Sequence, residues 1–213
     1  MAAKYLFVTP TSERVEDYYD ADEVIDFEHP AIEALADRLQ RRFGDSHDQY
    51  DEVGDIGFAQ AAFTFVRDGI AHSADVDDYS AAYRASDVLR LRNAICFGKA
   101  HLLTALLRAR DIATGLCYQR IADAGSRDGF VLHGLGATRL SGRWSRLDPR
   151  GNKPGVDAQF ELYDERLAWT VDPAQGEIDY PYVHPSPPPG LLAALRAARP
   201  GPDAYAHLPT GLA

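Results

Sequence analysis

The chain has 213 residues, of which 46% are hydrophobic and 25% are charged, and it carries a formal net charge of −10. These values are ordinary for a soluble globular protein, and the length suits one domain with a substantial core. The acidic balance argues against a nucleic acid as partner, because a surface that binds the phosphate backbone needs clustered Lys and Arg.

The sequence contains no sign of a membrane or a bound metal. No apolar run approaches the ~18 residues of a membrane span, and MAAKYLFVTP lacks the apolar centre of a signal peptide. We therefore expect a cytoplasmic protein without a membrane partner. Two cysteines, Cys96 and Cys117, do not make a disulfide framework, and no His or Cys spacing is typical of a zinc site. We expect neither a metal nor another cofactor, and the oligomeric state is left open.

The first third of the chain predicts strands and then helices. Residues 4–9 (KYLFVT) and 15–27 (VEDYYDADEVIDF) are rich in Tyr, Val, Ile and Phe, which predicts an N-terminal strand or hairpin. Pro30 opens a helix with His29 near its cap, and apolar residues at helical spacing predict a second helix over residues 56–70.

His72 and Asp75 follow the second predicted helix. They are interpreted either as partners in a loop hydrogen bond or as a metal or acid–base pair.

Residues 94–107 predict an amphipathic helix. Its apolar stripe comprises Cys96, Ala100, Leu103 and Leu107, with Leu102 and Leu106 beside them. Asn93 is a plausible N-cap, which places Cys96 in the first turn. The first backbone N–H groups of a helix favour a thiolate, so a cysteine there can be a nucleophile. The alternative is a small buried hydrophobe, as most free cysteines are.

Three antiparallel strands are predicted over residues 112–123, 130–140 and 143–148. A two-residue loop at Ser141-Gly142 joins the last two strands. The register that follows places Asp148 opposite Leu135. His133 and Asp148 then share a face as diagonal neighbours, about 7 Å apart along the backbone, so one hydrogen bond could orient the imidazole. The cysteine helix would have to end its first turn against that same face.

The same register places Arg150 directly opposite His133. Two roles for Arg150 stay open, namely contact with a substrate and compensation of local acidity.

The order of these blocks resembles the transglutaminase-like superfamily. The resemblance covers residues 26–148 and rests on a Cys at a helix start, then ALLRARDIATGLCY, then a His inside a strand, then W-x-x-x-D-P. It implies an α+β fold with a papain-like core of helices packed on an antiparallel sheet. It also implies that Cys96 is the nucleophile, that His133 is the general base and acid, and that Asp148 orients His133.

Two neighbourhoods depart from the usual pattern of this family. Ile95 stands where a Gly normally precedes the Cys, and Gly134-Leu135-Gly136 replaces an aromatic shortly after the His. These changes concern the shape of the substrate groove and the identity of the oxyanion donor.

Three functions are compatible with these residues. The first is cysteine-dependent acyl transfer on an amide or peptide-type bond through a thioester. The second is a thiol peptidase or amidase, in which water accepts the acyl group, and the third is a binding module that keeps the fold without turnover. The expected substrate of the enzyme is a peptide, a protein or a small amide.

The C-terminal part predicts an extension of the domain. Trp169 is expected to anchor a last core strand. Residues 180–190 (YPYVHPSPPPG) form a proline-rich spacer before a short helix, LLAALRAAR. We therefore expect residues 1–179 to form one transglutaminase-like domain and residues 180–213 to wrap its surface.

Overall fold

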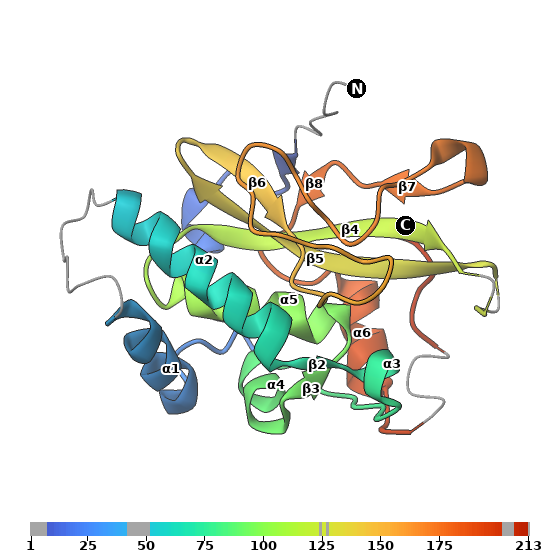
Figure 1. Ribbon diagram of the computed structural model, residues 1–213, viewed down its shortest axis with the longest axis horizontal. Helices are drawn as coiled ribbons and strands as arrows, with labels where there is room; N and C mark the ends of the chain where they lie inside the picture. The colour runs from blue at the N-terminus through green and yellow to red at the C-terminus, as the bar shows by residue number, and fades with distance from the viewer. Residues whose placement is uncertain (1–7, 42–51, 124, 127, 202–206, 213) are drawn as a thin grey trace.

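The computed structural model describes residues 8–41, 52–123, 125–126, 128–201 and 207–212. A curved four-stranded sheet of order β6-β5-β4-β7 lies over a layer of helices (Figure 1). The helical elements are η1 (Val15–Tyr18), α1 (Pro30–Gln40), α2 (Glu52–Gly69), α3 (Ser73–Val76), α4 (Ala85–Leu91), α5 (Cys96–Arg108), η2 (Pro173–Gln175) and α6 (Pro189–Ala197). The strands are β1 (Thr9–Pro10), β2 (Ala71–His72), β3 (Asn93–Ala94), β4 (Thr114–Ala122), β5 (Phe130–Leu140), β6 (Arg143–Leu147), β7 (Ile178–Asp179) and β8 (Tyr182–Val183).

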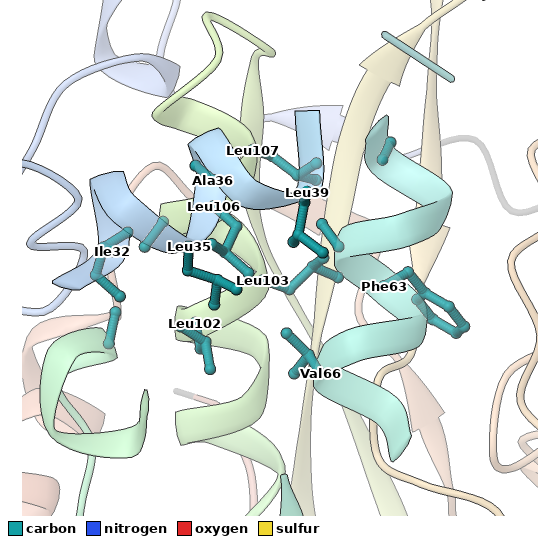
Figure 2. Packing of buried hydrophobic residues seen from close by; sticks show 14 of the residues in the cluster. Ile32, Leu35, Ala36, Leu39, Phe63, Val66, Leu102, Leu103, Leu106 and Leu107 are labelled. Atoms are coloured by element: carbon teal, nitrogen blue, oxygen red, sulfur yellow. The ribbon is translucent and has the colours of Figure 1, made fainter. Parts of the chain in front are cut away.

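Helix α5 is the centre of the molecule. It packs against β4 and β5 on one side and against α1, α2 and α4 on the other. Its leucines meet the apolar stripes of α1 and α2, as Figure 2 shows; the labelled residues are Ile32, Leu35, Ala36, Leu39, Phe63, Val66, Leu102, Leu103, Leu106 and Leu107. Burial of this area is the main stabilising contribution to the layer of helices.

The prediction of an amphipathic α5 was wrong in one respect, because every residue of this helix is buried. Several of its polar side chains find partners inside the protein. Arg108 donates to the backbone oxygen of Thr114, and His101 Nδ1 lies 2.7 Å from the oxygen of Tyr83. A helix that is covered on all sides shows no polar face to solvent, although its sequence contains polar residues.

The predicted hairpin and its register are confirmed. β5 ends at Leu140, β6 begins at Arg143, and these two residues pair across the turn. Both turn residues have positive φ, 51° at Ser141 and 71° at Gly142, as a two-residue hairpin loop requires. Gly136 pairs with Leu147 in the same register, so the ladder ends just before Asp148.

The N-terminal hairpin was predicted incorrectly. Residues 15–27 contain the short helix η1 followed by turns, and in the described part of the chain they form no strand. Asp22 explains the turn, because its Oδ1 accepts hydrogen bonds from the backbone nitrogens of Val24 and Ile25, both at 2.7 Å. Of the predicted strand 4–9, residues 4–7 lie outside the described residues, and β1 pairs in parallel with β8.

The two N-terminal helix predictions are confirmed. α1 begins at Pro30, and the His29 side chain accepts a hydrogen bond from the backbone nitrogen of Ala31, so His29 is its N-cap. α2 covers the predicted second helix and ends at Gly69.

The C-terminal segment differs from the prediction at Trp169, which lies in a loop; the last strand of the main sheet is β7. Two elements after residue 179 lie against the rest of the chain, because β8 pairs with β1, and Leu191 and Leu195 of α6 belong to the apolar cluster around Cys96. The division at residue 179 stays a prediction. In the described ranges no helix has the length and apolar content needed to cross a membrane.

Candidate active site

Cys96 is the first residue of α5, as its predicted place in the first turn requires. Its N-cap is Ile95, with extended backbone and no side-chain cap hydrogen bond. The predicted N-cap, Asn93, instead lies in β3, where its Oδ1 accepts a hydrogen bond from Ser73 Oγ at 2.8 Å. The free N–H groups of the first turn therefore surround the thiol with positive potential.

The sulfur of Cys96 lies against β5. The backbone nitrogen of Gly134 donates a hydrogen bond to Cys96 Sγ at 3.4 Å, and the residue is 9% exposed. An N–H group aimed at sulfur stabilises the thiolate over the thiol. Gly134 was noted in the sequence only as a departure from the family pattern, so this donor was missed.

Gly134 is required by the closeness of the helix. A Cβ atom at this position would lie 2.5 Å from Cδ1 of Phe97, the residue next to the nucleophile. Any larger residue would push β5 away from the start of α5, and with it the N–H group that contacts Cys96. The close contact with Phe97 thus explains why glycine stands at position 134, in the stretch where the family usually has an aromatic residue.

His133 and Asp148 form the predicted pair. His133 Nε2 lies 2.8 Å from Asp148 Oδ2, and both side chains are almost completely buried. Since a carboxylate only accepts, Nε2 carries a proton, which leaves Nδ1 as the nitrogen for Cys96. Asp148 is held by two further donors, the backbone nitrogens of Ala168 at 2.9 Å and Arg150 at 3.1 Å.

The way Cys96 reaches His133 differs from the prediction. Even-numbered residues of β5 face α5, since Leu132 packs with Phe97 and Cys96, whereas Leu135 packs in the cluster on the opposite face. By this alternation His133 lies on the face of β5 opposite α5, yet its side chain still forms a hydrogen bond with the side chain of Cys96. Contact is made at the edge of β5, because β6 ends opposite Gly136 and leaves the backbone of Gly134 accessible to sulfur.

The electrostatics of the pair favour a charged imidazole. Burial alone would lower the pKa of His133, but the charge of Asp148, its hydrogen bond and a hydrogen bond with the Cys96 side chain together raise that pKa well above its ordinary value. For Asp148 burial acts in the opposite direction, yet the charge and hydrogen bond of His133 and the two backbone donors lower its pKa. The site is thus arranged to hold an imidazolium between sulfur and carboxylate.

Cys117 has the opposite environment. It is completely buried on β4, and burial raises the pKa of its thiol to about 12. The structure keeps this cysteine as a neutral packed thiol, in agreement with the predicted placement on the strand face opposite Leu116 and Tyr118.

Trp169 covers the imidazole. Its ring meets the His133 ring edge-on with centroids 4.7 Å apart, and Arg150 Cζ lies 5.5 Å from the centre of the indole. From the sequence, Trp169 was expected only to anchor a core strand. Its contact with His133 depends on the path of a loop some twenty residues after Asp148, for which the sequence carries no periodic signal.

Arg150 is buried next to the pair. Its guanidinium donates hydrogen bonds from both Nη atoms to the carboxylate of Asp75, which also accepts from Lys153 Nζ at 2.7 Å. Substrate binding by Arg150 stays a prediction. Asp75 does not bond to His72; burial lowers the pKa of His72 to about 3 and leaves it neutral.

Metal binding was the alternative for His72 and Asp75. Over the described ranges no group of three or more His, Cys, Asp or Glu side chains has an arrangement suited to a metal ion.

A buried lysine supports the start of α5 from behind. Lys99, one turn after Cys96, is completely buried and donates to the backbone oxygens of Arg67 and Ile70 at the C-terminal end of α2. Burial lowers the pKa of Lys99 to about 7. The bonds satisfy the last carbonyl groups of α2 and fix that helix to the nucleophile segment.

The order and geometry of these residues match a known family. The model of the "Transglutaminase-like superfamily" matches residues 39–149, more than half of the chain. The chain belongs to the transglutaminase-like superfamily. The matched residues contain Cys96, His133 and Asp148, and the α+β architecture with helices on an antiparallel sheet is that of this superfamily.

Solved structures similar to this superfamily member are distant. A candidate cysteine protease from Cytophaga hutchinsonii is 16% identical, with a TM-score of 0.46 over 68% of this chain and 46% of that one. A TGase is 14% identical, with a TM-score of 0.38 over 71% of this chain and 42% of that one.

A candidate protease from Parabacteroides distasonis is 14% identical, with a TM-score of 0.33 over 55% and 26% of the two chains. This chain spans less than half of each of these proteins, and no curated protein is significantly similar to it.

Proposed function

We propose that this protein is a cysteine-dependent enzyme that acts on amide or peptide-type bonds through a thioester acyl-enzyme. The observation that carries the proposal is the set of contacts at Cys96: the thiol stands at an uncapped helix N-terminus and accepts from Gly134, while the adjacent His133 is bonded to buried Asp148. A packing cysteine needs none of these partners.

The first half-reaction follows from the protonation of the imidazole. His133 Nδ1 takes the proton of the Cys96 thiol, and the thiolate attacks the carbonyl carbon of the substrate. The oxyanion of the tetrahedral intermediate would lie near the N–H groups at the start of α5, including that of Cys96. Collapse breaks the C–N bond, and the proton on Nδ1 passes to the leaving amine.

The second half-reaction regenerates the thiol. Nδ1 takes a proton from the acceptor, which attacks the thioester carbonyl, and the sulfur leaves and regains the proton. Water as acceptor yields a carboxylic acid, as in a peptidase or amidase, and an amine yields a new amide, as in a transglutaminase. Asp148 holds one tautomer of His133 and stabilises the imidazolium in both halves.

The substrate proposed is a peptide, a protein or a small amide. All the chemistry is assigned to side chains and backbone N–H groups of the chain. A reducing compartment such as the cytoplasm suits the two free cysteines.

The competing account is a binding module that keeps the fold without turnover. It is favoured by Ile95 and Gly134, which depart from the family pattern next to the nucleophile and the histidine. The packing of Gly134 against Phe97 weakens that argument, since it explains the glycine through contacts that bring an N–H group to sulfur.

Activity-based labelling tests the proposal. Electrophilic peptide probes and amine acceptors are offered to the unchanged protein, to Cys96→Ala and to the matched control Cys117→Ala. The proposal expects labelling of the unchanged protein and of Cys117→Ala, and none of Cys96→Ala. Amine incorporation against hydrolysis then identifies the acceptor. Equal slow labelling of both cysteines would favour the binding module.

A further inference from the structure

Arg150 connects two carboxylates next to the imidazole. Its backbone nitrogen donates to Asp148 Oδ1 at 3.1 Å, and its side chain binds Asp75, with Nη2 2.8 Å from Oδ1 and Nη1 close to Oδ2. The Arg150 side chain is 4% exposed, whereas that of Asp75 is 25% exposed. A buried guanidinium therefore depends on one carboxylate at the edge of the protein for its charge partner.

The same guanidinium has other cations around it. The charges of Arg150 and Lys99 act on the partly buried His72, and Lys153 Nζ also binds the Asp75 carboxylate. Asp75 thus binds two cations of this region, Arg150 and Lys153. Without its charge, Arg150 would be left buried beside Asp148, whose carboxylate has the geometry that a guanidinium binds in a bidentate manner.

Such an exchange would disable the triad. Asp148 uses Oδ2 for His133 and Ala168 and Oδ1 for the backbone of Arg150. A guanidinium on this carboxylate would compete with His133 Nε2 and neutralise the charge that holds the imidazolium. It would also leave the face of Trp169, which packs on His133.

We propose that Asp75 is a positioning residue for the triad, which holds the Arg150 guanidinium on itself and so leaves the Asp148 carboxylate to His133. The inference rests on the proposed function, because it assigns Asp75 to the activation of Cys96. Asp75 lies on α3, far from the nucleophile in sequence, and acts through Arg150 without touching the reacting atoms.

The test uses the rate at which iodoacetamide alkylates Cys96, measured between pH 5 and pH 9 in a Cys117→Ser background. Asp75→Asn keeps the size of the side chain and removes its charge. We expect its alkylation rate near neutral pH to fall by about tenfold or more, with a displaced pH profile, because the shift corresponds to at least one pKa unit in the imidazole. Asp37→Asn, which removes another aspartate paired with an arginine, is the matched control and should leave the rate unchanged.

A double variant separates positioning from simple stability. In Asp75→Asn/Arg150→Met no guanidinium remains to compete for Asp148, so most of the lost alkylation rate should return. A double variant as slow as the single one, or an Asp75→Asn protein as fast as the parent, would overturn the inference. If the parent protein itself reacts like an ordinary thiol, the proposed function fails and the role of Asp75 fails with it, a pattern distinct from failure of Asp75 alone.

Discussion

Replacement of Asp148 by asparagine separates the orientation of His133 from packing. The carboxylate is 0% exposed and accepts from His133 Nε2, the Ala168 nitrogen and the Arg150 nitrogen. An amide of the same size has one oxygen. If this oxygen stays on His133 and Ala168, the amide nitrogen faces the Arg150 N–H group, and one buried donor loses its acceptor.

The structure gives the size of both effects. One buried N–H without an acceptor costs about 1–3 kcal/mol of unfolding free energy, or roughly 2–12 °C in melting temperature for a chain of this length. The chemical effect is larger, because the charge that stabilises the imidazolium and selects its tautomer is gone. Turnover should fall by on the order of 10³- to 10⁴-fold.

The two effects are measured on the same sample. Thermal melting gives the change in stability, and iodoacetamide alkylation in a Cys117→Ser background gives the reactivity of Cys96, which should fall by about tenfold or more at neutral pH. Asp157→Asn, an exposed aspartate paired with Arg166, controls for loss of an ion pair. A lower melting temperature with unchanged alkylation would remove Asp148 from the triad and leave a Cys–His pair.

Two further changes test the surroundings of the site. Gly134→Ala should lower the unfolding free energy by about 1–3 kcal/mol and slow alkylation, because its Cβ would overlap Phe97; urea unfolding with no loss would contradict the close contact of α5 and β5. Burial lowers the pKa of His101 to about 4, below the value of about 6.5 in the unfolded chain. The unfolded state therefore binds the proton first, and the free energy of unfolding falls as the pH drops from about 6.5 to 4. This loss of unfolding free energy is up to roughly 3 kcal/mol and should be smaller in His101→Gln, when urea unfolding is compared at pH 7 and pH 4.5. Equal losses in the parent and the variant would refute the role of His101.

Local rules in the sequence were sufficient for the His133–Asp148 pair. A two-residue turn fixes the register of a hairpin, and the alternation of a strand then fixes which side chains share a face. The first-turn position of Cys96 followed from helical periodicity in the same way. The prediction that α5 packs on the face of β5 that carries His133 was wrong. The sequence does not determine where along the edge of β5 the helix begins.

Long-range contacts could not be predicted. Asp75 meets Arg150 and Trp169 meets His133 through loops whose paths are determined by tertiary packing, and polar residues such as Lys99 concealed the complete burial of α5. The strand predicted over residues 15–27 was wrong for another reason. Asp22 offers hydrogen bonds to nearby backbone nitrogens, which favours a turn over the β propensity of the neighbouring Val and Ile.

The proposed function requires that Cys96 forms an acyl thioester with help from His133. The most direct measurement is intact-mass and peptide-mapping spectrometry of the Cys117→Ser protein, quenched in acid shortly after mixing with p-nitrophenyl acetate. We expect a single acetyl group on Cys96, formed in a burst that precedes steady release of p-nitrophenol and is abolished in His133→Ala. Acetyl groups only on lysines, or acetylation of Cys96 at the same rate in His133→Ala, would contradict it.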